Sequence, residues 1–453
     1  MRDFIIRTPK CALWVDMGLG KTLITLAALL YINPPKHVLI TSFKQISKLT
    51  WEEEIKKWNL PFRYTSLVGL SKNERLKAFE NLKSTQPSII TINKEVLYMI
   101  PEYFGDDIPF GTLIIDEAQL IKGFNTKVTK AVMDMAPHLD RIIELTGTPA
   151  PNNWLDVWSQ IYILDDGERL FDNYYEYRNA YFTPNKTFRV TDKHGNKQIR
   201  HGDWQVKPHM IPLITNKISD IVVSVGNNLV QLPPLIKKTI EVTLSPREKY
   251  AYDYMKKEYV LPLTPDLKVS AANVAVVCAK LRQLASGFIY INETHEYALI
   301  STRKAEALAD LIENTKDDNL LVFYTFIADE AIIDDVLSKK NIEYTIFDGS
   351  KDVKDAWDKG GIHVMLANPA KSARGLNLQM GGATIVWYNQ TFNLEQKLQG
   401  TKRIWRPGQT KDVTEYELIT KGTIDVDIAH ALADKKQSQA ILTDAVTKQI
   451  TYS

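Results

Sequence analysis

A glycine-rich stretch near the start of the chain, "WVDMGLGKT" (Trp14–Thr22), has the residue types of a phosphate-binding loop. The apolar run "ALWV" predicts a strand, "DMGLG" predicts a turn, and "TLITLAALLY" predicts a helix. Such a turn points backbone N–H groups at phosphate oxygens, while a lysine neutralises the outer phosphates and the next hydroxyl holds Mg²⁺. We therefore expect the nucleotide to be bound by Gly18, Leu19, Gly20, Lys21 and Thr22.

The match is to the tail of the phosphate-loop pattern only. The full pattern places a glycine six residues before the lysine, and this chain has Val15 at that position. An incidental glycine turn is therefore the alternative to a nucleotide loop at this point.

A pair of carboxylates provides the second element of the chemistry. The stretch "LIIDEAQ" ends an apolar run with Asp116 and Glu117, and burying two carboxylates is costly unless they have partners or a task. Asp116 can hold Mg²⁺ through water, and Glu117 can position or deprotonate an attacking water. A pair that caps a helix start is the alternative, but the phosphate-loop pattern upstream favours the catalytic interpretation.

Two arginines in "KLQGTKRIWRPGQ" provide the third element. Arg403 and Arg406 are three residues apart, which predicts one side of a helical turn. A guanidinium fork suits the charge that spreads over a γ-phosphate in the transition state. Ordinary surface arginines are the alternative. If their lobe faces the first one, ATP lies in a cleft with Lys21 on one wall and the arginines on the other, and hydrolysis opens and closes the cleft.

These residues must be positioned by two α/β lobes. Apolar runs alternate with helical patterns in residues 11–150 and again in residues 319–420, which predicts parallel sheets covered on both faces. Residues 1–232 form the first expected lobe and residues 233–453 the second. The predicted strands are "CALWV", "HVLITSF", "SIITI", "GTLIID" and "RIIEL", then "NLLVFY", "EYTIF", "IHVMLA", "TIVWY" and "VTEYELI".

The material between the two sets of runs differs in character. An insertion at about 154–215 begins with aromatic residues at helical spacing and continues as a basic segment, in which "DKHGNK" predicts a hairpin turn. From Lys186 to Lys207, six Lys or Arg residues face two Asp residues; a solvated excursion and a nucleic-acid contact both remain open. The prolines in "QLPPLIKK" predict an extended connector, about 246–298 is mainly helical, and a last helix runs through "DVDIAHALADKKQSQAIL".

The composition is that of an ordinary globular chain of 453 residues, with 44% hydrophobic and 24% charged residues. The formal net charge of +2 shows no global polybasic character, so any nucleic-acid site must be a local patch. Two distant cysteines argue against a disulfide framework and a zinc module, and no apolar run is long enough to span a membrane. We expect a cytoplasmic protein without a membrane contact.

In their order along the chain, these stretches resemble the SWI/SNF-type double-stranded DNA translocases of the superfamily 2 helicase-type ATPases. The resemblance covers nearly the whole chain and implies two RecA-like lobes of the P-loop NTPase kind with helical insertions. It rests on "DMGLGKT", "LITSFKQISKLTWEEEIKKW", "DEAQLIKGFNTKVTKAV", "LTGTPAPNN", "LPPLIKKTIEVTLSPREKYAYDYM", "KLRQLASGF", "LVFYTFIADEAIIDDVL", "FDGS", "SARGLNL" and "QGTKRIWRPGQTKDVTEYELITKGTID".

The resemblance also assigns roles to single residues. Arg403 and Arg406 become arginine fingers, and Thr146 and Thr148 belong to a motif that couples the ATP site to movement. Further nucleotide-site positions are Gln119, Gly375, Gln399 and Gln409. Sequence-neutral DNA contacts are implied for Ser42, Lys44, Asn93 and Lys94 in the first lobe and for Thr325 and Ser372 in the second.

The chain departs from the family pattern at several points. Gln119 stands where the family commonly has His, and Asn389 where it often has Asp. Trp405 replaces a usual His, and it either packs the cleft or stacks on the base. In the family, a segment upstream of the phosphate loop recognises adenine. We expect the given chain to begin inside that element, which leaves phosphate binding intact and places adenine selectivity in question.

The function expected from the sequence is an ATP-dependent motor that uses Mg²⁺ and moves along duplex DNA, in a bacterial or phage-infected cell. A strand-separating helicase on DNA or RNA is one alternative. A DNA-binding clamp that does not hydrolyse ATP is another. The sequence does not indicate protein partners, the direction of movement or the oligomeric state.

Overall fold

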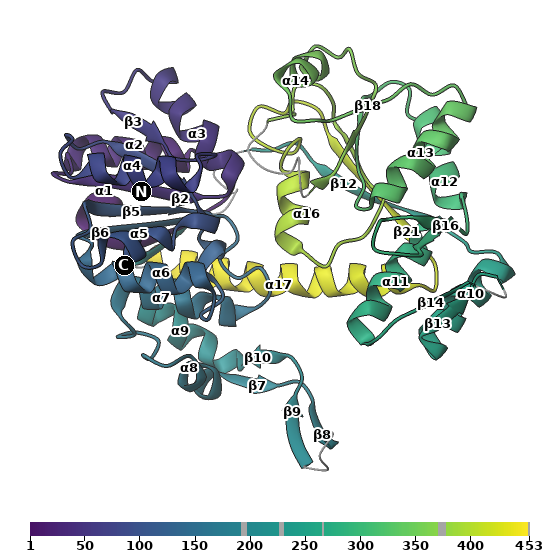
Figure 1. Ribbon diagram of the computed structural model, residues 1–453, viewed down its shortest axis with the longest axis horizontal. Coiled ribbons are helices and arrows are strands. Elements are labelled where there is room, and N and C mark those ends of the chain that lie inside the picture. The colour runs from purple at the N-terminus through teal and green to yellow at the C-terminus, as the bar shows by residue number, and fades with distance from the viewer. Residues whose placement is uncertain (192–196, 226–230, 265–266, 370–376, 452–453) are drawn as a thin grey trace. The chain divides into compact units, whose positions relative to one another are not determined.

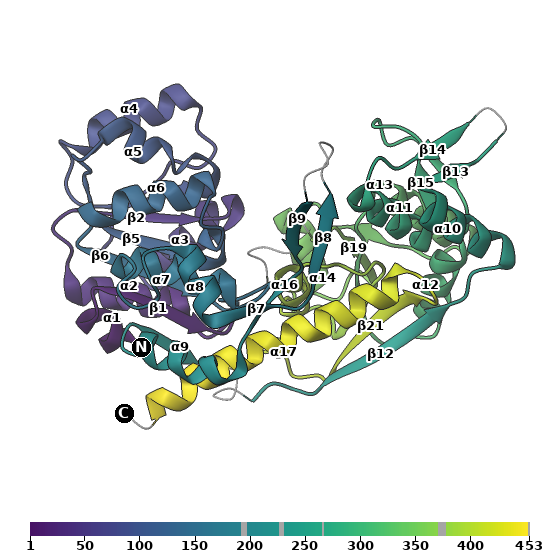
Figure 2. The same cartoon turned by 90° about the horizontal axis from the view of Figure 1, so that it is seen from below.

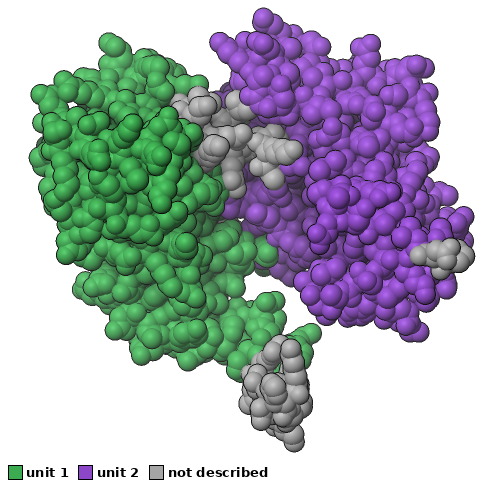
Figure 3. All heavy atoms as spheres, viewed as in Figure 1, with its two compact units in different colours: residues 1–230, 435–453 green, residues 231–434 purple. Residues whose placement is uncertain are grey.

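The computed structural model describes residues 1–191, 197–225, 231–264, 267–369 and 377–451. The chain divides into two compact units, which Figure 3 distinguishes by colour. Unit 1 comprises residues 1–230 and 435–453, and unit 2 comprises residues 231–434. The expected boundary after residue 232 lies close to this division. The last residues, 435–453, group with unit 1, whereas the sequence places them in the second lobe.

Unit 1 is built on a seven-stranded sheet with the order β11-β1-β6-β5-β2-β4-β3, in which all neighbours are parallel. All five predicted strands of the first lobe are present, and β3 and β11 add an edge strand on each side. The strands are β1 (Lys10–Val15), β2 (His37–Ser42), β3 (Tyr64–Ser66), β4 (Ile89–Asn93), β5 (Phe110–Asp116), β6 (Arg141–Thr146) and β11 (Val222–Val225).

Helices cover both faces of this sheet because alternate strand residues point to opposite sides. Leu13 packs in one buried cluster with the helices α1 to α3, and Trp14 packs in the other with α4 to α9. The helices are α1 (Arg2–Arg7), α2 (Lys21–Ile32), α3 (Lys44–Lys57), α4 (Lys72–Leu82), α5 (Met99–Phe104), α6 (Lys127–Met135), α7 (Trp158–Asp165), α8 (Tyr174–Tyr181) and α9 (Ile211–Ile218).

The insertion of unit 1 contains α7 and α8 and then two short antiparallel pairs. β7 (Phe182–Pro184) pairs with β10 (Trp204–Val206), and β8 (Thr187–Thr191) pairs with β9 (Lys197–His201). Figure 1 shows β8 and β9 as a hairpin that extends away from β7 and β10. The hairpin turn expected at residues 192–196 lies outside the described residues.

Unit 2 is built on a six-stranded parallel sheet with the order β12-β21-β20-β17-β19-β18. The five predicted strands are present, but part of the expected connector is itself a strand. β12 follows Pro233 and Pro234 and pairs with β21 from Leu235 to Val242, at the edge where a preceding proline is tolerated. The strands are β12 (Leu235–Val242), β17 (Leu320–Phe323), β18 (Thr345–Ile346), β19 (Val364–Ala367), β20 (Thr384–Trp387) and β21 (Val413–Thr420).

Helices also cover both faces of the second sheet. α12 (Arg303–Glu313) and α13 (Ile327–Lys339) pack on one face, and α14 (Lys351–Asp358) packs on the other through Trp357. α16 (Leu394–Thr401) lies so close to this second face that a Cβ on Gly400 would stand 2.7 Å from the Trp387 ring.

A separate buried cluster holds the helical region at the start of unit 2. It joins α10 (Pro246–Glu258) and α11 (Val274–Ser286) to the beginning of α17 (Ile424–Thr451). Figure 2 shows both α10 and α11 beside the hairpin of β13 (Val260–Pro262) and β14 (Lys268–Ser270). A second hairpin pairs β15 (Phe288–Tyr290) with β16 (Tyr297–Leu299). Within the described ranges, no helix has the length and apolar character needed to cross a bilayer.

Candidate functional site

The loop between β1 and α2 has the backbone geometry of an anion site. Gly18 and Gly20 have φ values of 84° and 73°, a region that favours glycine. A Cβ on Gly20 would meet no atom within 4 Å, so its backbone angle rather than crowding requires glycine. Gly20 is the N-cap of α2, and no side chain caps this end and no acidic residue lies in the first turn. The N-terminus of α2 can therefore take an anion.

Lys21 is held at this loop by backbone carbonyls. Its Nζ donates to the oxygens of Val15 at 2.8 Å and Asp16 at 3.3 Å. The next residue, Thr22, lies half-buried in the first turn of α2. A lysine and a hydroxyl thus stand beside the anion-accepting helix end, as phosphate binding requires.

The acidic pair lies at the carboxyl end of β5 in the same unit. Both Asp116 and Glu117 are buried. Burial, and next the charge of Glu117, raise the pKa of Asp116 to about 7, while Lys21 and a hydrogen bond from Trp51 act in the opposite direction. Glu117 has a φ of 72°, a strained value for a residue with a side chain. The pair is therefore a site that a cation would stabilise.

A chain of hydrogen bonds extends from Glu117 to the end of the neighbouring strand β6. Gln119 Nε2 donates to Glu117 Oε2 at 2.7 Å, and Thr146 Oγ1 donates to Gln119 Oε1 at 2.7 Å. The N–H of Thr148 donates to Thr146 Oγ1 at 2.9 Å. Gln119 therefore fixes the orientation of the Glu117 carboxylate, and the Thr146 hydroxyl fixes that of Gln119. This link lies entirely within unit 1.

The residues present fit a magnesium ion that is bound together with a nucleotide. No group of three or more His, Cys, Asp or Glu side chains with metal-binding geometry exists in the described part of the chain. Mg²⁺ commonly uses only one or two protein oxygens and takes its other ligands from phosphates and water. The Thr22 hydroxyl and the Asp116 carboxylate would supply such oxygens.

The expected DNA-contact positions of unit 1 lie at the carboxyl ends of β2 and β4. Ser42 and Asn93 are register partners, and both are buried. Asn93 Nδ2 donates to Glu95 Oε2 at 2.7 Å, and Lys94 Nζ lies 4.4 Å from the centre of the Phe43 ring. Lys44 begins α3, and its side chain is outside the described part of the structure.

The two arginines lie in turns after α16 rather than on a helix. α16 ends at Thr401, and Arg406 precedes Pro407, which disfavours helical geometry at that point. Arg403 is buried and its carbonyl accepts from the N–H of Leu378 at 3.0 Å. Arg406 donates to Asn377 Oδ1, and burial lowers the pKa of its guanidinium. The expectation of one helical side is wrong, because α16 ends at Thr401, before both arginines.

The remaining positions near the arginines have internal partners. Trp405 Nε1 donates to the Pro233 carbonyl at 2.8 Å and its ring packs against the second core face of unit 2, so packing is its role here. Gln399 Nε2 donates to Glu395 Oε1 at 3.1 Å. Gln409 Nε2 donates to the carbonyls of Gln379 and Gly382, each at 3.1 Å. Two expected positions, Ser372 and Gly375, lie outside the described residues.

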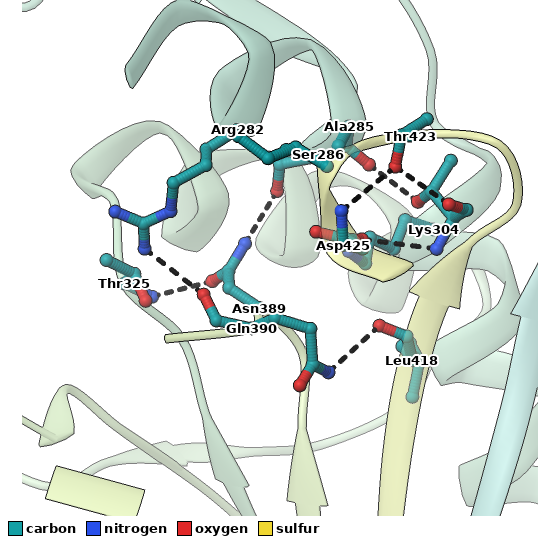
Figure 4. A network of polar contacts seen from close by, with 12 residues as sticks. Arg282, Ala285, Ser286, Lys304, Thr325, Asn389, Gln390, Leu418, Thr423 and Asp425 are labelled. Carbon is teal, nitrogen blue, oxygen red and sulfur yellow. Dashed lines mark hydrogen bonds and ion pairs between the residues drawn. The ribbon is translucent and has the colours of Figure 1, made fainter. Parts of the chain in front are cut away.

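Asn389 organises the backbone at the carboxyl end of the unit 2 sheet (Figure 4). Its Oδ1 accepts from the Thr325 N–H at 2.7 Å and its Nδ2 donates to Ser286 Oγ at 2.9 Å. Ser286 in turn donates to Asp329, whose pKa burial raises to about 6. An aspartate at 389 would lose the N–H donor and place a second carboxylate near Asp329, so the amide suits this network.

Comparison with known proteins identifies the family. The model of the SNF2-related domain matches residues 7–287. The chain belongs to the SNF2-related family. A relative identical at 30% of positions, protein p41 of Acyrthosiphon pisum secondary endosymbiont phage 1, is matched over 99% of this chain and 97% of its own length.

Other relatives of this SNF2-related chain are much longer proteins. An uncharacterized ATP-dependent helicase of Mycoplasma pneumoniae is 26% identical, and the match covers 93% of this chain and 39% of the relative. The SWI/SNF chromatin-remodeling complex subunit snf22 of Schizosaccharomyces pombe is 24% identical, with 91% and 25% covered. Among solved structures, the Sulfolobus solfataricus SWI2/SNF2 ATPase core in complex with dsDNA is 22% identical, with a TM-score of 0.41 and coverage of 100% and 92%.

One contact in the SNF2-related core was not foreseen from the sequence. The indole Nε1 of Trp51 donates to Asp116 Oδ2 at 3.0 Å. The sequence marks Trp51 as part of a family motif, but an apolar pattern on a helix does not reveal which polar atom the indole reaches. The bond joins residues 65 positions apart, and only the folded sheet brings them together.

Proposed function

We propose that this SNF2-related chain is an ATP-dependent motor that moves along duplex DNA. The observation that carries the proposal is the convergence, within unit 1, of an uncapped helix N-terminus, a lysine and a buried carboxylate pair. Nucleoside triphosphate hydrolysis needs these three parts: a phosphate cradle, a positive charge and a metal-and-water site. The cytoplasm of a bacterial or phage-infected cell fits this activity and the phage relative.

The side chains of unit 1 have distinct tasks in this proposal. ATP would supply the phosphoanhydride bond that is hydrolysed, and a bound Mg²⁺ would neutralise charge on its phosphates. Lys21 neutralises the outer phosphates, and Thr22 with Asp116 holds the metal. Glu117 orients the attacking water and accepts its proton, because its carboxylate is buried beside the phosphate loop and is held in one orientation by Gln119.

Unit 2 contributes the arginines in this proposal. Arg403 and Arg406 stabilise the charge that develops on the transferred phosphoryl group, a task for which the guanidinium fork is suited. Their internal contacts with the 377–378 segment give them a defined position on unit 2. Gln399 and Gln409 brace the same region through bonds to Glu395 and to the carbonyls of residues 379 and 382.

DNA contacts in the proposal are phosphate contacts, which are sequence-neutral and sensitive to salt. In unit 1 they come from the ends of β2 and β4, where Lys94 lies over the Phe43 ring. In unit 2 they come from the region of Thr325, whose N–H is fixed by Asn389. Support for a DNA substrate comes from relatives named as chromatin-remodeling and helicase proteins.

Rates of ATP hydrolysis test this proposal. They are measured without nucleic acid and with single-stranded DNA, duplex DNA or RNA at equal nucleotide concentration. The motor on duplex DNA predicts the greatest stimulation by duplex DNA, at a level that falls as salt is raised. Equal rates in all four conditions, together with tight DNA binding, would contradict the proposal.

A strand-separating helicase is the second candidate, and the insertion of unit 1 favours it. Arg178 lies over the Trp204 ring at 4.3 Å and over the Tyr175 ring at 5.1 Å. Tyr175 is 53% exposed and Phe188, in the hairpin, is 49% exposed. Exposed aromatic rings beside a cation provide stacking surfaces for unpaired bases. Stimulation by single strands and ATP-dependent unwinding, both lost in Tyr175→Ala, would favour this candidate.

A DNA-binding clamp that does not hydrolyse ATP is the third candidate. It keeps DNA affinity but has no nucleotide chemistry. A titration with a fluorescent ATP analogue distinguishes it from the motor, because the motor requires saturable binding that depends on Lys21.

A further inference from the structure

Helix α3 is joined to the acidic pair by a buried hydrogen bond. Trp51, in the middle of α3, is fully buried, and its indole Nε1 donates to Asp116 Oδ2 at 3.0 Å. An indole N–H is a donor only and cannot change its role. The bond therefore fixes one oxygen of the Asp116 carboxylate and leaves the other oxygen for a metal ion.

The start of α3 makes a second contact with the acidic motif. Phe43, the N-cap residue of α3, packs with Leu120 in a small buried cluster of their own. Leu120 lies in the short 3₁₀ helix η2 (Ala118–Ile121), next to Gln119, which holds the Glu117 carboxylate. Helix α3 and its N-cap residue therefore contact the region of the acidic pair at two points. Trp51 contacts Asp116 directly, and Phe43 contacts Leu120, which follows Gln119 in the chain.

The same end of α3 lies among the expected DNA-contact positions. Lys94 Nζ stands 4.4 Å from the centre of the Phe43 ring, and Ser42 and Lys44 flank Phe43 in the chain. Phe43 therefore lies between a surface proposed to take DNA phosphates and the residues proposed to take the metal and the water. A small shift of α3 would therefore move both the proposed DNA-contact positions and the side chains around Asp116 and Glu117, because the contacts of α3 are buried and closely packed.

We propose that Trp51 is a positioning residue for Asp116, and that α3 transmits DNA binding at its start to the metal-holding carboxylate. This inference rests on the proposed function and deepens it, because it names the element through which DNA would stimulate hydrolysis. Contact of DNA with the start of α3 would shift this helix, and with it the Trp51 indole that holds the Asp116 carboxylate.

The variant Trp51→Phe tests the positioning role in the full chain. Phenylalanine keeps an aromatic ring in the buried site and removes only the N–H donor and the second ring. Binding of a fluorescent ATP analogue is measured against Mg²⁺ concentration and, separately, with EDTA. We expect the half-saturating Mg²⁺ concentration to rise about tenfold, as the loss of a hydrogen bond to a charged group implies. Affinity without Mg²⁺ stays unchanged, a split that a general loss of structure would not give.

The matched control is Trp158→Phe. Trp158 is also a buried tryptophan of unit 1, but its indole N–H donates to the backbone oxygen of Phe171 at 3.1 Å. This variant removes an indole hydrogen bond that involves neither Asp116 nor Glu117. We expect its Mg²⁺ dependence to match that of the unmodified chain.

The coupling role is tested by Leu120→Ala, which removes the contact with Phe43 and alters no proposed DNA, metal or water ligand. We expect the ratio of the hydrolysis rate with duplex DNA to the rate without it to fall at least about threefold, while the half-saturating Mg²⁺ concentration without DNA stays unchanged. If Trp51→Phe does not fold, as judged by its circular dichroism melt, this variant still tests α3 as the transmitting element.

Two results would overturn the inference. One is a Trp51→Phe protein that is folded and has an unchanged Mg²⁺ dependence. The other is an unchanged stimulation ratio in Leu120→Ala. If the proposed function is wrong, the hydrolysis rate of the unmodified chain is not stimulated by any nucleic acid. The Mg²⁺ dependence of nucleotide binding in Trp51→Phe still tests the positioning role of Trp51 in that case.

Discussion

The two units have the same kind of parallel sheet but carry different groups where a helix follows a core strand. In unit 1, α2 follows β1 and begins without a side-chain cap or an acidic residue in its first turn. In unit 2, α13 follows β17, and the Asp329 carboxylate closes its start by accepting from the Phe326 N–H at 2.8 Å. One helix start is open to an anion, and the other already has one.

The polar groups at the strand ends differ in the same way. Unit 1 places the carboxylates of Asp116 and Glu117 there, with Lys21 nearby. Unit 2 places the amides of Asn368 and Asn389 there, which bind the backbone oxygen and N–H of Thr325. The same parallel-sheet scaffold therefore carries different polar groups at its strand ends in the two units. Unit 1 carries an uncapped helix start and a buried carboxylate pair, whereas unit 2 carries amides that hold its own backbone.

The largest expected effect tests the nucleotide role of unit 1. Lys21→Ala or Glu117→Gln should abolish hydrolysis, because one removes the phosphate charge and the other removes the proton acceptor. DNA affinity should stay within severalfold, since other residues carry that task. Steady-state hydrolysis and a DNA-binding titration measure the two properties. Asp329→Asn, the matched change at the helix start of unit 2, should leave hydrolysis measurable. A complete loss of hydrolysis in this variant would contradict the assignment of the nucleotide site to unit 1.

The next effect tests the catalytic contribution of unit 2. Arg403→Ala should lower turnover by about 10³-fold or more, the range known for arginine fingers. The control is Arg303→Ala, because Arg303 is half exposed and pairs with Glu248 at 3.2 Å on the same unit. An Arg403 effect under tenfold would make this residue a packing residue and would leave unit 2 without a catalytic group.

The smallest expected change is in the pH dependence of nucleotide binding, which depends on the ionisation of Asp116. Asp116 must ionise to hold Mg²⁺, and its pKa is raised to about 7 in the free protein, mainly by burial. The proton competes with the metal below that pH, so Mg²⁺-dependent nucleotide affinity should fall up to about tenfold per pH unit as the pH drops from 7 to 5.5. Titrations at each pH, with EDTA as the control, measure this change. A flat profile would show that Asp116 does not ionise on metal binding.

The local parts of the site were predictable from the sequence. The phosphate loop is a strand, a turn and a helix that are consecutive in the chain, and β5 ends at Asp116 as its apolar run does. Periodicity and adjacency therefore sufficed for five strands of each sheet. The edge strand β11 was not predicted because it follows the long insertion. The strand β12 was not predicted because Pro233 and Pro234, directly before it, favoured an extended connector.

The contacts that connect these parts were not predictable. Thr146 and Gln119 are 27 positions apart, and Trp51 and Asp116 are 65 apart. Their meeting depends on β6 and β2 lying on either side of β5, a property of strand order and not of any local pattern. The helical spacing of Arg403 and Arg406 was also a wrong guide, because α16 ends at Thr401 and both arginines follow it in turns.

Displacement of a third strand from a DNA triplex is the decisive measurement of movement along duplex DNA, because only movement along intact duplex removes that strand without separating the other two. For a motor on duplex DNA, we expect ATP-dependent displacement by the unmodified chain, none by Glu117→Gln, and no unwinding of the underlying duplex. Sustained hydrolysis without displacement, or displacement only with separation of the duplex strands, would contradict it.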